Sequence, residues 1–123
     1  MIAFVKRVLK KARVTTGELN IVLLHDKDML KMNGDHLGHW YATDVLSFPI
    51  EEQRKGVIDG EVYINIGQAR RQAKEYVVTY KNEIARLTVH GILHLLGYDD
   101  RTKQQKLQMT RLENTYLELL TEG

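Results

Sequence analysis

Two histidines and two aspartates lie within one short run of the chain, and their spacing is that of a metal site. His90 and His94 are four residues apart in a segment with helical periodicity, so both imidazoles share one face of a helix. Gly97 is expected to end this helix and let the chain turn back toward the histidines with Asp99 or Asp100. Two nitrogens and one carboxylate, with a fourth position open to water, form a common catalytic zinc site.

The apolar character of this helix favours a shared cation over two isolated core histidines. Residues 83–96 are apolar on nearly every side, and Ile92, Leu93 and Leu95 offer no hydrogen bond to a buried imidazole. A cation bound between the two rings would remove, for both histidines, the free-energy cost of burying a ring nitrogen without a partner. For the aspartates a simpler explanation stays open, since either can cap the helix expected after them.

The residue after the first histidine separates this pattern from that of the zinc proteases. In their helical motif a glutamate stands there and acts as the general base. Here the position is Gly91, which argues against peptide hydrolysis. A glycine also lets another segment, or the substrate, approach the helix closely.

Length and composition are those of one small domain, residues 1–123. No apolar run approaches the roughly 20 residues that span a bilayer, so no membrane partner is expected. The chain has no cysteine, which excludes thiolate metal sites and agrees with a cytoplasmic protein. The formal net charge of +2 permits RNA binding without arguing for it.

The apolar pattern predicts an α+β fold: a mixed sheet of three to four strands packed with four to five helices, with the metal site at the end of a buried helix. Strands are predicted at residues 18–25, 44–50 and 61–66. Loops are predicted at residues 35–43 and 51–60, and a break between two helices at residues 80–82. Helices are predicted at residues 1–13, from Asp26 as N-cap to near Gly34, from Gly67, at residues 83–96 and at residues 102–120.

The run from His90 to Asp100 closely resembles the signature of the YbeY family of bacterial rRNA-maturation endoribonucleases, His-Gly-x-Leu-His-Leu-x-Gly-Tyr-Asp-His. A second match is Thr-Asp-Val-Leu-Ser-Phe-Pro at residues 43–49. A third, weaker one is Gly-Glu-Val-Tyr-Ile at residues 60–64, where the family usually reads Gly-Asp followed by apolar residues. Order and spacing fit the family from about Asp26 to the C-terminus.

This resemblance implies an α+β fold and one divalent metal ion, expected to be zinc, held by His90, His94 and Asp100. It also implies cleavage of single-stranded RNA, with a role in small-subunit rRNA maturation and ribosome quality control. The expected partners are therefore RNA and the small ribosomal subunit, with no small-molecule cofactor.

Three departures from the family pattern bear on these expectations. Asp100 stands where the family has a third histidine, and its oxygen can bind zinc. The added negative charge should make a bound water less acidic, and the harder oxygen ligand can also admit other divalent ions. Leu37 takes the place of an arginine that would contact phosphate, and Arg86 and His39 are the candidates to replace it. The family also usually has a strand before the first helix, so the sheet is expected to be one strand short.

The expected reaction uses the metal as a Lewis acid on a phosphate oxygen, as a source of hydroxide, or both. Asp99 is the nearest spare carboxylate for proton transfer, while Trp40 and Tyr41 either stack on an unpaired base or pack in the core. Two alternatives stay open. One is a metallohydrolase of another substrate, such as a peptide. The other is a ribosome-associated binding protein with weak or lost nuclease activity.

Overall fold

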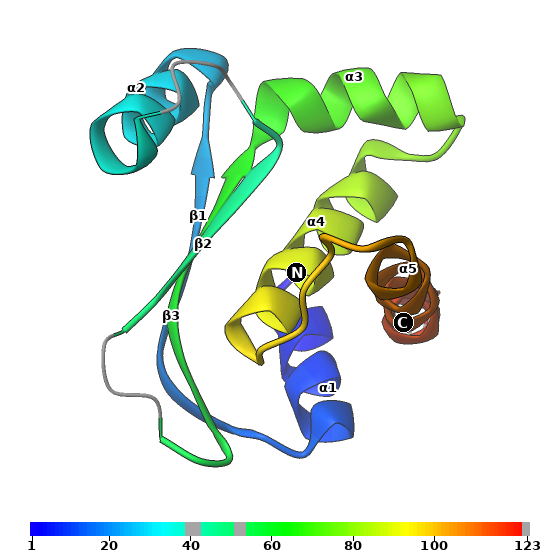
Figure 1. Ribbon diagram of the computed structural model, residues 1–123. Coiled ribbons are helices and arrows are strands. Elements are labelled where there is room, and N and C mark those ends of the chain that lie inside the picture. Colours follow the sequence, from blue (N-terminus) through cyan, green and yellow to red (C-terminus); the bar gives the residue numbers. More distant parts are fainter. Residues whose placement is uncertain (39–42, 51–53, 122–123) are drawn as a thin grey trace.

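The computed structural model describes residues 1–38, 43–50 and 54–121. Within these ranges, none of the helices is long and apolar enough to cross a lipid bilayer. The described residues form the following helices and strands, in chain order (Figure 1): α1 (Ile2–Ala12), β1 (Thr15–Leu24), α2 (Asp26–Leu37), β2 (Val45–Pro49), β3 (Val57–Asn65), α3 (Ile66–Tyr76), α4 (Tyr80–Leu95), α5 (Lys103–Leu117) and the 3-10 helix η1 (Glu118–Thr121).

The three strands form a mixed sheet in the order β1-β3-β2, which confirms the predicted α+β fold. β3 pairs in parallel with β1 and antiparallel with β2. Val62 and Ile64 on this central strand are fully buried. Figure 1 shows α1, α4 and α5 on the same side of the sheet, with α4 lying against the strands and α5 beyond it.

The predicted loop of residues 51–60 extends too far along the chain. β3 begins at Val57, inside the predicted loop of residues 51–60, because Ile58 is buried and pairs with β1 at Thr16. The polar Asp59 is also buried there, where it accepts hydrogen bonds from the Glu18 backbone and the Arg54 guanidinium. The start of β3 therefore reads as polar in the sequence, although its buried charge, Asp59, is paired within the protein.

The helix boundaries differ for similarly local reasons. The predicted break at residues 80–82 is the first turn of α4, because the Thr79 side chain accepts from the Asn82 N–H and caps the helix. α2 extends to Leu37, so the predicted loop of residues 35–43 begins later than expected. The N-cap of α2 is His25 and not the predicted Asp26, whose carboxylate instead accepts a hydrogen bond from the Arg71 guanidinium.

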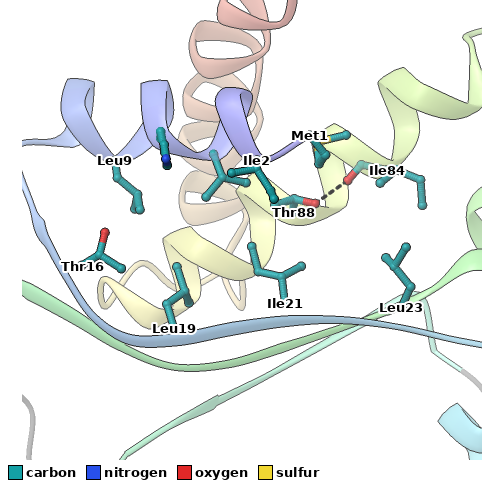
Figure 2. Close-up of a pocket in the computed structure, with 11 residues that line it drawn as sticks. Met1, Ile2, Leu9, Thr16, Leu19, Ile21, Leu23, Ile84 and Thr88 are labelled. Atoms are coloured by element: carbon teal, nitrogen blue, oxygen red, sulfur yellow. Dashed lines mark hydrogen bonds between the residues drawn. The ribbon is translucent and has the colours of Figure 1, made fainter.

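An apolar pocket of about 590 Å³ lies between α1, β1 and α4, beside the β1 edge of the sheet (Figure 2). Leu9, Leu19, Ile21 and Ile84 are among the residues that line it. Its described lining contains no histidine and no carboxylate. The predicted metal-binding residues lie elsewhere, with His90 and His94 farther along α4 and Asp100 after its end.

α4 approaches the sheet closely at Gly91. Ser47 and Val62 stand opposite each other on β2 and β3, and both meet this point of the helix. The Ser47 hydroxyl donates a hydrogen bond to the Gly91 carbonyl oxygen at 3.0 Å. A Cβ on Gly91 would lie 2.4 Å from Val62 Cγ1, far inside van der Waals contact. The glycine thus sets the distance between the helix that bears both histidines and the sheet.

Replacing this glycine should destabilise the protein even though alanine is the better helix former. We expect Gly91→Ala to lower the free energy of unfolding by about 1–3 kcal/mol, because Val62 and the helix must move apart. Urea denaturation with a chelator present measures this without any contribution from bound metal. Lys81→Ala, at an exposed position of the same helix, should change stability by less than about 0.5 kcal/mol. A Gly91→Ala protein more stable than the wild type would contradict the close packing.

Candidate metal centre

Three side chains converge where α4 ends and the chain turns toward α5. His90 and His94 occupy the last turns of α4, and Asp100 lies in the connection that follows. Gly97 has a φ of +99°, a left-handed conformation that glycine adopts readily and that turns the chain after the helix. α5 then begins with a capping box in which Thr102, not either aspartate, is the N-cap. The capping explanation for Asp99 and Asp100 is therefore ruled out.

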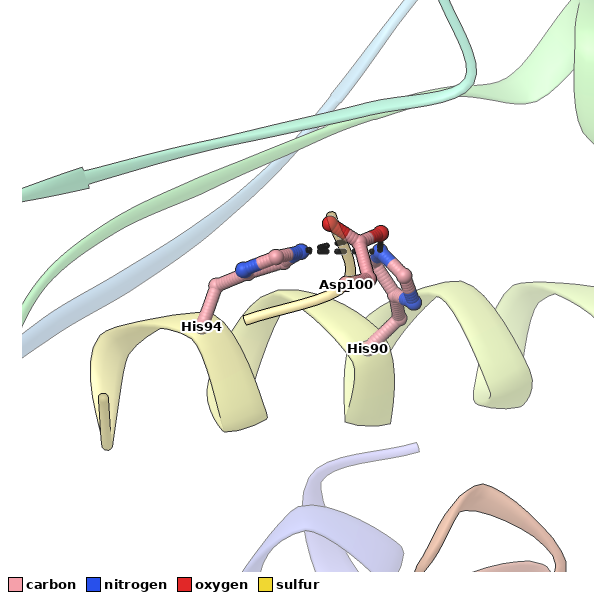
Figure 3. Close-up of side chains that lie close together, drawn as sticks. All are labelled: His90, His94 and Asp100. Carbon is pink, nitrogen blue, oxygen red and sulfur yellow. Dashed lines mark hydrogen bonds and ion pairs between the residues drawn. The ribbon is translucent and has the colours of Figure 1, made fainter. Parts of the chain in front are cut away.

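The three ligand atoms form a triangle of the size that a metal ion requires (Figure 3). His90 Nε2 and His94 Nε2 are 3.0 Å apart, and Asp100 Oδ2 lies 3.4 Å from the first and 3.5 Å from the second. Ligands at 2.0–2.2 Å from a tetrahedral zinc ion are separated by about 3.3 Å from one another. The observed triangle matches one face of such a tetrahedron, so these residues can hold a zinc-sized ion.

The second ring nitrogen of His90, Nδ1, contacts a residue that the sequence pattern did not identify. His90 Nδ1 lies 2.7 Å from Oε2 of Glu113, a buried carboxylate on α5. Met109, Leu112 and Tyr116 also pack toward the core from α5, and a carboxylate between them on this face is the sequence signal that could have identified Glu113.

The electrostatic surroundings of His90 favour a positive charge at this ring. Burial opposes the charged imidazolium, but the hydrogen bond and charge of Glu113 outweigh it and raise the pKa of His90. The charges of Asp100 and Asp44 also raise the pKa of His90. A cation is therefore favoured at the centre of this cluster, whether it is a proton or a metal ion.

Arg86 is bound within the protein, one turn before His90. Its guanidinium donates from Nε to Glu83 at 2.8 Å and from Nη1 to Glu113 at 3.3 Å. Glu83 is buried, and its hydrogen bond and charge raise the pKa of Arg86 further above the usual range. Gln72 of α3 also donates to Glu83, at 2.6 Å. These contacts connect three helices behind the histidines.

The other predicted site residues lie apart from this cluster. The Asp99 side chain is about half exposed and lies 3.7 Å from Arg101. Leu37, at the position where an arginine was expected, is exposed at the end of α2. His39, Trp40 and Tyr41 fall outside the described residues. The RNA contacts predicted for Arg86 and His39 stay predictions.

Comparison with known proteins agrees with this geometry. A family model described as Endoribonuclease YbeY matches residues 1–121. The chain belongs to the YbeY family of endoribonucleases. This confirms the resemblance seen in the sequence and extends it from Asp26 back to the N-terminal helix.

Individual members of the YbeY family and one solved structure show the same relationship. The chain is 38% identical to Endoribonuclease YbeY of Chloroherpeton thalassium over 116 residues, covering 94% of this chain and 81% of that protein. It is 32% identical to the Bacillus licheniformis protein of the same name, covering 88% and 78%. The solution structure of TM1509 from Thermotoga maritima matches with a TM-score of 0.69 at 28% identity, over 95% of this chain and 76% of that one.

The two neighbouring aspartates offer a matched test of the metal centre. We expect Asp100→Ala to weaken zinc binding by about 100-fold or more, because it removes one of three ligand atoms. Asp99→Ala should bind zinc as the wild type does. Competition with a chromophoric chelator measures both affinities. Equal losses in the two variants, or none in either, would show that Asp100 is not a ligand.

Proposed function

We propose that this protein is a metal-dependent endoribonuclease that cleaves single-stranded RNA. Its proposed metal is zinc, and its proposed role is the maturation and quality control of small-subunit rRNA in the cytoplasm. The observation that carries the proposal is the triangle of His90, His94 and Asp100 ligand atoms in a member of an endoribonuclease family. The rRNA substrate and the ribosomal partner follow from the family resemblance.

A bound divalent ion would supply Lewis-acid catalysis at a phosphate oxygen. The chain would supply the ligands that hold the ion on one side, leaving the other side to the substrate. Asp99, next to Asp100 and partly exposed, is the carboxylate that we propose for proton transfer. It would accept a proton from the attacking group or return one to the leaving oxygen.

A basic pocket beside the site supports an RNA substrate. His94, Gly97, Arg54 and Lys55 are among the residues that line this pocket of about 410 Å³. The Arg54 side chain is paired with Asp59 but remains 60% exposed, and Lys55 is exposed. The charge of Lys55 and the exposed part of the Arg54 guanidinium, beside the proposed ligand His94, suit a phosphate backbone better than a peptide.

Cleavage assays with and without a chelator test this function against its alternatives. We expect an unstructured RNA to be cleaved, cleavage to stop with chelator and return with added zinc, and casein to remain intact. His94→Ala should abolish cleavage under all these conditions. Casein cleavage without RNA cleavage would instead identify a protease. Ribosome binding with no metal-dependent cleavage would identify a binding protein that has lost its activity.

The role of Asp99 is tested by kinetics on the zinc-loaded protein. We expect Asp99→Asn to lower kcat by about 10²-fold or more while the zinc content stays the same, since proton transfer is lost but the ligands remain. Arg101→Gln, which removes the neighbouring cation, serves as the control and should change kcat far less. An unchanged kcat in Asp99→Asn would leave proton transfer to another group.

A further inference from the structure

Glu113 is held by contacts to both of its carboxylate oxygens. Oε2 lies 2.7 Å from His90 Nδ1, and Oε1 accepts a hydrogen bond from Arg86 at 3.3 Å. The residue is only 5% exposed, so these contacts replace the water that a carboxylate would otherwise bind. A buried charge that aims one oxygen at a ring nitrogen has a defined orientation.

The position of this oxygen selects one form of the His90 ring. An ionised carboxylate only accepts hydrogen bonds, so it requires a proton on Nδ1. In the neutral ring the lone pair is then on Nε2. That nitrogen is the one that lies 3.0 Å from His94 Nε2 and 3.4 Å from Asp100 Oδ2. Glu113 thus directs the lone pair into the triangle.

A network of hydrogen bonds behind Glu113 fixes the orientation of its carboxylate, and with it the orientation of the His90 ring. Arg86 joins Glu113 to Glu83, and Glu83 accepts from Gln72. Glu83 and Gln72 are both buried, and the chain of contacts runs from α3 through α4 to α5. Within the described residues, no buried side-chain nitrogen or oxygen lacks a hydrogen-bond partner. The orientation of the imidazole is therefore coupled to the packing of three helices.

We propose that Glu113 is the positioning residue of the metal centre: its carboxylate holds His90 in the Nδ1–H tautomer and so presents Nε2 to the ion. Removing a carboxylate that accepts a hydrogen bond from a metal-binding histidine typically weakens metal binding by 10- to 100-fold. The inference rests on the proposed metal site and adds the group that orders it.

Zinc affinity in three variants tests the inference. We expect Glu113→Leu to bind zinc about 10- to 100-fold more weakly than the wild type. Glu113→Gln should retain most of the affinity, because its amide oxygen can still accept from Nδ1–H. Asn114→Leu, at the exposed neighbouring position on α5, controls for a bulky apolar change and should bind as the wild type does.

A second readout reports the ring itself and needs no metal. Nitrogen-15 NMR of the metal-free protein, at a pH where the His90 ring is neutral, should show the Nδ1–H tautomer in the wild type and in Glu113→Gln. Glu113→Leu should shift His90 toward the Nε2–H form, a change that a merely structural role of Glu113 would not predict.

The outcomes separate this inference from the proposed function. A wild type that binds no zinc overturns both. A wild type that binds zinc, beside a folded Glu113→Leu with the same affinity and tautomer, overturns the inference alone. If Glu113→Leu does not fold, Glu113→Asp retains the charge beside Arg86 but withdraws it by one methylene from His90. Wild-type zinc affinity in Glu113→Asp then overturns the inference.

Discussion

A side chain of a single hydrogen atom at Gly91 allows α4 to lie against β2 and β3, where a Cβ would meet Val62 at 2.4 Å. At the same point, the Ser47 hydroxyl donates a hydrogen bond to the Gly91 carbonyl oxygen. His90 precedes this contact and His94 follows it by less than one turn, so the backbone that carries both histidines is held at a fixed distance from the sheet. The segments at residues 43–49 and 90–100, distant in sequence, therefore act as one unit in the structure.

Burying α4 creates a second requirement, because the helix contains charged and polar groups on the side away from the sheet. Glu83 is 1% exposed, and a lone carboxylate at such a position would be costly. Arg86 and Gln72 bind it, and Arg86 also binds Glu113. Breaking one partner of such a buried network usually destabilises a protein more than forming the network stabilises it. The network is better understood as a device for orientation than as a source of stability.

The parts that could be predicted from the sequence are those fixed by local spacing. Helical periodicity and a glycine stop suffice to bring His90 and His94 to one face and to return Asp100 toward them. The apolar pattern likewise predicts the α+β class. The match to the YbeY family confirms the resemblance that residues 43–49 and 90–100 carry.

What the sequence did not reveal depends on contacts between distant segments. Glu113 is 23 residues from His90, and only the packing of α5 against α4 brings them together. The first residues of β3 read as a loop because the burial of Asp59 depends on Arg54 and on the backbone of Glu18. The early start of α4 depends on one side-chain cap at Thr79. In each case a tertiary or capping contact outweighs a local polar pattern.

The charges around the histidines also have a thermodynamic consequence for the substrate. The carboxylates of Glu83, Glu113 and the partly exposed Asp100 outnumber the cation of Arg86 among the described residues, which leaves surplus negative charges when the imidazoles are neutral. A divalent ion at the proposed centre would cancel them, whereas without it the same cluster would repel a phosphate group. Ion and RNA would then bind with positive coupling, each raising the affinity for the other by the same factor. Under this linkage, the free metal concentration around the protein sets how tightly it holds its RNA.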